Sequence, residues 1–129
     1  MKKLLLKYSI FLAIFWAITI FGLCATPGQY IPNANWLELL SFDKFVHASI
    51  FFILCTLLLI ISIKYKQSKT AILIYFLISV LYGGLLEIMQ AKCFSNRAGD
   101  WQDFFANSFG CAVALLLFKK LSRFLKTTN

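Results

Sequence analysis

The sequence predicts an all-helical, polytopic membrane protein whose chain crosses the bilayer four times. Three observations predict this class: the composition, four long apolar stretches, and an uneven distribution of basic residues. Of the 129 residues, 60% are hydrophobic and 14% are charged, whereas a soluble domain is about one quarter charged. So few polar groups could not cover the surface of a soluble protein.

The chain carries a net charge of +8, which in a soluble protein would suggest a nucleic-acid partner. Here the basic residues lie at the ends of apolar stretches, where membrane orientation explains them better. We find no DNA- or RNA-binding pattern, and we expect no nucleic-acid partner.

Four stretches approach the roughly 20 apolar residues that a helix needs to cross the hydrocarbon core. They are residues 4–24, 45–63, 70–91 and 103–118, the last being shorter and polar at its start. Each must be helical, because lipid offers no partner to open backbone groups. The first is longer than a typical signal-peptide core, so we expect it to stay uncleaved. Residues 1–129 are thus interpreted as a single transmembrane domain that ends in a basic tail, 119–129.

The connecting segments set the orientation of these spans. The N-terminus, residues 64–69 and the tail together hold ten of the thirteen Lys and Arg residues. The positive-inside rule then places both termini in the cytoplasm. In the first outer segment, Trp36–Leu40 either forms a short interfacial helix or packs as a loop over the helix ends. All acidic residues fall on the outer side: Glu38, Asp43, Glu87, Asp100 and Asp103.

Polar pairs at helical spacing mark the outer ends of three predicted helices. The pairs are Asp43 with His47, Glu87 with Gln90, and Asp103 with Asn107. Each pair shares one helix face, and an ionised group in lipid costs about 2.5–3.5 kcal/mol at mid-bilayer. We therefore expect the three faces to surround one outward-facing polar pocket. Arg97 and Asp100 lie on the next loop, which Gly99 allows to turn tightly over the pocket.

An ordered set of residues on successive helices carries a family resemblance. It reads Asp43-Lys44-x-x-His47, then Glu87-x-x-Gln90, then Arg97-x-x-Asp100-x-x-Asp103-x-x-x-Asn107-x-x-Gly110. This set resembles the VanZ-like membrane proteins over roughly residues 25–118. That family is named for a bacterial protein that raises resistance to the glycopeptide teicoplanin without altered peptidoglycan precursors. The resemblance implies a bacterial cytoplasmic membrane and a pocket facing the exterior, but it implies no particular reaction.

Three of these residues are candidates for catalysis. His47 and Glu87 could transfer protons, with Asp43 orienting the imidazole one turn away. The alternatives are structural: His47 is a buried residue that hydrogen-bonds Asp43 one turn away, and Glu87 forms an ion pair with Arg97 or Lys44.

The candidate ligand-binding residues surround them, and they are Lys44, Gln90, Arg97, Asp100, Asp103 and Asn107. The guanidinium of Arg97 could hold a phosphate or carboxylate in bidentate fashion, or could pair with Asp100 or Asp103. Asp103 is also expected to cap the fourth helix. Asp100 and Asp103 with Glu87 could hold a divalent cation through oxygens, but with a single histidine and no metal-binding pattern among the acidic residues we predict no metal site and no cofactor.

Two functional hypotheses follow. In the first, the protein binds, and could chemically modify, an amphiphile at the outer membrane face, such as a lipid-linked cell-wall intermediate, a phospholipid headgroup or a glycopeptide-type ligand. In the second, it is a non-catalytic accessory or scaffold subunit whose polar cluster serves helix packing and partner docking. A transport path is disfavoured, because the inner halves of the helices carry no charged residue.

Overall fold

The computed structural model describes residues 1–27, 36–94 and 98–126, and every regular element within them is a helix. The elements are α1 (Lys2–Ala25), α2 (Trp36–Lys64), α3 (Lys69–Lys92), α4 (Trp101–Leu116) and α5 (Phe118–Lys126). The all-helical class predicted from the sequence is therefore confirmed for these residues.

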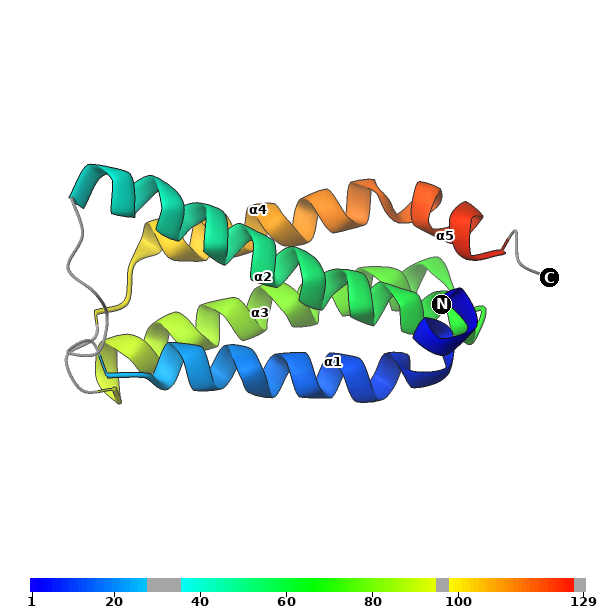
Figure 1. Cartoon of the computed structure of the whole chain (residues 1–129), viewed down its shortest axis with the longest axis horizontal. Helices are drawn as coiled ribbons and strands as arrows, with labels where there is room; N and C mark the ends of the chain where they lie inside the picture. Colours follow the sequence, from blue (N-terminus) through cyan, green and yellow to red (C-terminus); the bar gives the residue numbers. More distant parts are fainter. Residues whose placement is uncertain (28–35, 95–97, 127–129) are drawn as a thin grey trace.

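The helices form an elongated bundle with two distinct ends (Figure 1). At one end, here called the terminal end, α1 begins, α2 gives way to α3, and α5 lies. At the other, here called the loop end, α1 and α3 finish while α2 and α4 begin. The start of α1 and the end of α5 therefore lie on the same side of the bundle.

Three helical segments are long and apolar enough to cross a membrane: Lys2–Ala25, Phe42–Lys64 and Lys69–Lys92. The pair α4 and α5 qualifies as a fourth only when taken together, and it bends by 47° between its halves. Large apolar side chains also cover the outside of the bundle, with Phe11 65%, Leu81 70% and Phe105 67% exposed. Such a surface is expected where hydrocarbon rather than water surrounds the helices.

The helix α2 begins nine residues earlier than the sequence predicted. The predicted second span began at residue 45, but α2 begins at Trp36, because residues 36–44 contain no Gly or Pro that would stop a helix. Trp36–Leu40 is therefore neither a separate interfacial helix nor a loop, but the first turns of α2. The basic tail is not a simple extension either, since residues up to Lys126 form α5.

The core is centred on α2, whose Phe51, Cys55 and Leu59 are fully buried. A Cβ atom at Gly110 would lie 2.0 Å from the carbonyl oxygen of Ala48, so α2 and α4 touch backbone to backbone. Small residues on membrane helices permit such a close approach, and Gly110 provides it here. This contact fixes how closely the polar side chains of α2 and α4 can meet.

Candidate functional site

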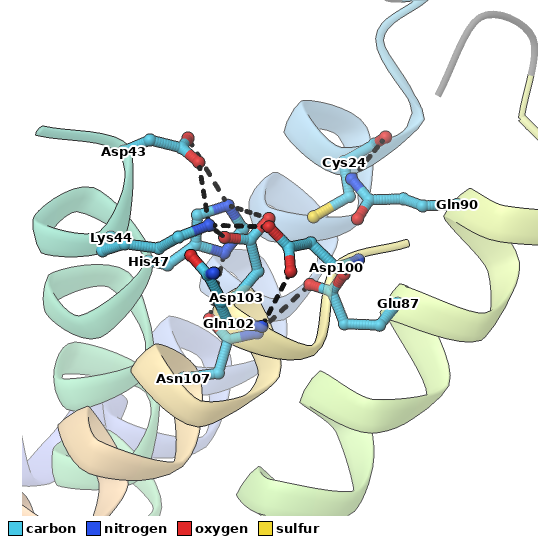
Figure 2. Close-up of polar contacts among 10 residues, drawn as sticks. All are labelled: Cys24, Asp43, Lys44, His47, Glu87, Gln90, Asp100, Gln102, Asp103 and Asn107. Atoms are coloured by element: carbon cyan, nitrogen blue, oxygen red, sulfur yellow. Dashed lines mark hydrogen bonds and ion pairs between the residues drawn. The ribbon is translucent and has the colours of Figure 1, made fainter. Parts of the chain in front are cut away.

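Polar side chains from three helices meet near the loop end of the bundle (Figure 2). We call this group the polar cluster, and it consists of Asp43, Lys44, His47, Glu87, Asp100, Asp103 and Asn107. Lys44 lies at its centre. Its Nζ donates to Asp100 Oδ2 at 3.0 Å and to Asp103 Oδ1, and lies 3.8 Å from Asp43 Oδ2.

The imidazole of His47 lies beside the same aspartates. Its Nε2 atom is 3.7 Å from Asp43 Oδ1 and 3.8 Å from Asp103 Oδ2. Its Nδ1 atom is 3.1 Å from Asn107 Oδ1. The side chain is 13% exposed, so protein groups surround most of the ring. Asp43 thus lies where it can orient the imidazole, as its i,i+4 spacing predicted.

Glu87 connects α3 to this arrangement. Its Oε2 accepts from the backbone N–H of Asp100 at 3.1 Å, and its Oε1 accepts from Asn107 Nδ2 at 3.5 Å. Asn107 therefore stands between Glu87 and His47, and the three form a chain of contacts across α3, α4 and α2. The predicted alternative of a Glu87–Lys44 ion pair is wrong among the described residues, because the carboxylates that Lys44 contacts are aspartates.

The start of α4 corrects a second prediction. Asp100, not Asp103, is the N-cap, and its side chain accepts from the backbone N–H of Gln102 at 2.8 Å. The helix begins two residues before the predicted 103, so Asp103 lies inside the first turn and turns toward Lys44 and His47. Hydrogen bonds from the Gln102 backbone and from Lys44 lower the pKa of Asp100 below its ordinary value of 3.8.

Gly99 brings the loop before α4 onto α3. A Cβ atom there would lie 2.4 Å from the carbonyl oxygen of Glu87 and 3.1 Å from Ala91 Cβ. Among the described residues no glycine has a positive φ. The glycine is therefore required by the close approach of two backbones, and not by the tight turn that the sequence suggested.

Two of the predicted site residues stand apart from the polar cluster. Gln90 is 4% exposed, and its Nε2 donates to the carbonyl oxygen of Cys24 on α1 at 3.2 Å. It is thus an interhelical hydrogen-bonding partner, as is Asn107. Arg97, the predicted anion-binding residue, lies outside the described residues, so its role stays a prediction.

A groove of about 500 Å³ runs between α3 and α4. Its walls are mainly apolar, and Glu87, Gly99 and Asp100 stand at its loop end. The apolar part is formed largely by Val80, Leu81, Leu85, Ile88 and Phe104. The sequence could not distinguish these side chains from ordinary lipid-facing ones, because both kinds are apolar and recur at helical spacing.

The polar cluster also places three metal-ligating groups together. One ligand atom each from Asp43, His47 and Asp103 lies within 4.8 Å of the other two. Sequence spacing pairs Asp43 with His47, but Asp103 joins them only through the packing of α2 against α4. The sequence therefore predicted no metal site, and the group emerges from the fold.

Comparison with known proteins adds no further identification. No protein-family model, curated protein or solved structure matches the chain. The VanZ-like resemblance thus stays a prediction that depends on the spacing of the polar residues.

Proposed function

We propose that this VanZ-like chain binds a headgroup-bearing amphiphile at the outer face of a bacterial cytoplasmic membrane. In this proposal α1, α2, α3 and α4 cross the bilayer, with both termini and the basic α5 in the cytoplasm. The loop end, with the polar cluster, then faces the exterior. The shared side of the two chain ends and the excess of basic residues at the terminal end support this orientation.

The groove between α3 and α4 is the observation that carries the proposal. An amphiphile needs an apolar channel that ends in polar groups, and this groove has both. Leu81, Leu85 and Ile88 would contact a hydrocarbon tail, while Glu87 and Asp100 stand where a headgroup would lie. The mostly apolar walls match a lipid chain better than a water-soluble substrate.

The charge of the polar cluster restricts the chemical class of the headgroup. Among the described residues the polar cluster holds four carboxylates (Asp43, Glu87, Asp100 and Asp103) and one fixed cation, Lys44, which contacts the three aspartates. Such an acidic surface favours hydroxyl or amino donors, which lipid-linked glycan intermediates and glycopeptide-type ligands both carry. A link to teicoplanin-type resistance is part of the proposal on this ground and on the family resemblance.

Two leucines on α3 allow a matched test. Leu85 lines the groove and is 53% exposed, whereas Leu77 is 46% exposed and lies outside it. Leu85→Trp should fill the groove, and Leu77→Trp should only add a lipid-facing ring. Each variant is purified in nanodiscs with bacterial envelope lipids, and the retained amphiphiles are quantified by mass spectrometry.

The proposal expects wild type and Leu77→Trp to retain the same enriched species, and Leu85→Trp to lose it. In cells, Leu77→Trp should leave teicoplanin susceptibility at the wild-type level, and Leu85→Trp should change it. Identical lipid profiles for all three proteins would refute amphiphile binding in the groove.

The second candidate is an accessory subunit whose polar cluster only joins helices. The observation in its favour is that Lys44, His47 and Glu87 each already contact partners within the bundle. His47→Gln and Glu87→Gln distinguish the two functions. Variants that accumulate normally but lose the retained amphiphile support a binding site, whereas variants that fail to accumulate support a structural cluster.

A further inference from the structure

We propose that Asp43, His47 and Asp103 form a binding site for one divalent transition-metal cation. This inference goes beyond amphiphile binding and does not depend on it. The Nε2 atom of His47 is 3.7 Å from Asp43 Oδ1 and 3.8 Å from Asp103 Oδ2. Ligands about 2.0–2.2 Å from a tetrahedral Zn²⁺ lie about 3.3–3.6 Å from one another. The three ligand atoms lie within 4.8 Å of one another, so an inward movement of the side chains would complete the site.

The buried Asn107 indicates which nitrogen of His47 is available. Asn107 is 1% exposed, and its Nδ2 faces Glu87 Oε1 at 3.5 Å. Its carbonyl oxygen Oδ1 must then face His47 Nδ1, which is 3.1 Å away. An oxygen acceptor at this position places the imidazole hydrogen on Nδ1. In the neutral ring, the lone pair of Nε2 then points toward the two aspartates.

This tautomer leaves three acceptors facing one another. One ligand atom each from Asp43, His47 and Asp103 lies within 4.8 Å of the other two, so a cation placed between them would be within reach of all three. The hydrogen bond from the second ring nitrogen to a fixed oxygen is also the contact that orients metal-bound histidines. Glu87 and Asn107 lie outside the three ligands, and they fix the geometry independently of them.

Lys44 does not occupy the same position. Asp43 and Asp103 each direct one oxygen toward the Lys44 ammonium and the other toward His47. With Asp100 included, three negative charges face one positive charge, which leaves room for a divalent cation. The Asp43 side chain is 45% exposed, so water or an anionic group could complete the coordination sphere.

The ligand set defines the class of metal. One imidazole nitrogen with two carboxylate oxygens suits Zn²⁺ or Mn²⁺ better than Mg²⁺ or Ca²⁺, which prefer oxygen alone. Three protein ligands with an open position are also typical of reactive rather than purely structural zinc sites. Zn²⁺ is therefore the probe of choice, and Co²⁺ is its spectroscopic substitute.

The test measures metal binding without any amphiphile, so it can fail independently of the proposed function. Full-length protein with a histidine-free tag is placed in phosphatidylcholine nanodiscs and stripped with a chelator. After Zn²⁺ is added and excess removed, bound zinc is counted by mass spectrometry. We expect about one Zn²⁺ per chain, and a Co²⁺ visible spectrum of nitrogen and oxygen ligands.

Asp43→Asn and Asp100→Asn are a charge-matched pair. Both remove one carboxylate beside Lys44, but only Asp43 offers an oxygen to the site. Asp43→Asn should weaken Zn²⁺ binding about tenfold or more, and Asp100→Asn by about threefold or less, through charge alone. His47→Gln should abolish the Co²⁺ spectrum. Because Asp43 is nearly half exposed, its variant should fold even where His47→Gln does not.

Two results would overturn the proposal. The first is the absence of stoichiometric zinc in wild type, which would show that a proton on Nε2 satisfies the two aspartates. The second is equal weakening in Asp43→Asn and Asp100→Asn, which would show attraction to the acidic surface without coordination. Equal retention of zinc in His47→Gln would lead to the same conclusion.

Discussion

Buried polar groups obtain their hydrogen-bonding partners differently at the two ends of the bundle. Toward the loop end, Lys44, His47 and Asn107 contact groups on other helices. Toward the terminal end, Ser9 and Ser62 are fully buried, yet each hydroxyl donates to a carbonyl oxygen three residues earlier on its own helix. The buried hydroxyls at the terminal end are therefore satisfied within one helix. The links between helices there come from exposed ammonium groups, since Lys2 donates to a carbonyl oxygen on α5 and Lys64 to one on α1. The polar contacts that determine how α2, α3 and α4 associate are concentrated at the loop end.

The largest loss of stability is expected from a substitution that pushes α2 and α4 apart. In Gly110→Ala the new Cβ would meet Ala48 backbone atoms at 2.0 and 2.8 Å, and backbone cannot move as a side chain can. We expect a loss of about 3 kcal/mol or more in the free energy of unfolding, from the upper range of overpacking costs. Denaturant titration of the purified protein measures it.

Gly22→Ala provides the control for this prediction. Nothing lies within 4 Å of a Cβ at that position on α1, so alanine should be neutral or should stabilise the helix by up to about 1 kcal/mol. Equal losses from the two variants would show that the backbone contact at Gly110 does not govern the packing.

The next effect concerns the contact chain through Asn107. Asn107→Leu leaves His47 Nδ1 and Glu87 Oε1 without their contacts to this side chain. An unsatisfied buried group costs about 1–3 kcal/mol, so we expect a destabilisation in this range. Thermal unfolding in matched detergent measures it.

Ser108→Ala is the neighbouring control for Asn107. Ser108 donates to the Phe104 carbonyl of its own helix, so its replacement should change stability by about 0.5 kcal/mol or less. If Ser108→Ala proved as costly as Asn107→Leu, the distinction between bonds across helices and bonds within a helix would fail.

A smaller loss of stability is expected when the N-cap of α4 is replaced. Asp100→Ala removes the bond to the Gln102 backbone and should cost about 1 kcal/mol. Asp100→Asn keeps a capping oxygen and should cost less. Equilibrium unfolding of both variants at neutral pH checks this order, and a reversed order would contradict the assignment of Asp100 as the cap.

The lowered pKa of Asp100 predicts that the stability of the protein depends on pH. Because the pKa of Asp100 is lowered in the folded protein, its stabilising contribution is present above the unfolded pKa of about 3.9. That contribution is lost as the pH falls through the lower folded value. The stability difference between wild type and Asp100→Asn should therefore shrink in acid and be constant near neutral pH.

The smallest effect is expected at the terminal end. Ser62→Ala removes a hydroxyl whose bond stays within α2, and we expect a change of about 0.5 kcal/mol or less. The same unfolding assay measures it. A loss comparable to that of Asn107→Leu would mean that both ends depend equally on their polar groups.

Helical spacing was sufficient to predict most of the polar cluster. Asp43 with His47, and Asp103 with Asn107, share a face on their helices, and a low-polarity surrounding makes their inward orientation favourable. The same rule placed Gln90 beside Glu87, but Gln90 turns to the α1 backbone at Cys24. Spacing defines a face of about one third of a helix, and it does not say which neighbour that face meets.

Other features depend on distances between helices, which spacing does not encode. Lys44 contacts Asp100 and Asp103, and these residues are more than fifty positions away in sequence. Along the groove, a Cβ atom at Gly84 would lie 3.2 Å from the Phe104 ring, so this wall too depends on a distance between helices. The early start of α2 was missed because a span was equated with its apolar part, although a helix can continue beyond the hydrocarbon.

The lateral position of the groove has a consequence for any molecule that enters it. Its exposed walls, including Leu81, Leu85 and Ile88, lie on the flank of the bundle rather than at its tip. A guest would arrive by two-dimensional diffusion within the leaflet, without first dissolving in water. Occupancy would then follow the guest's mole fraction among neighbouring lipids, so even a compound of negligible aqueous solubility could saturate the site.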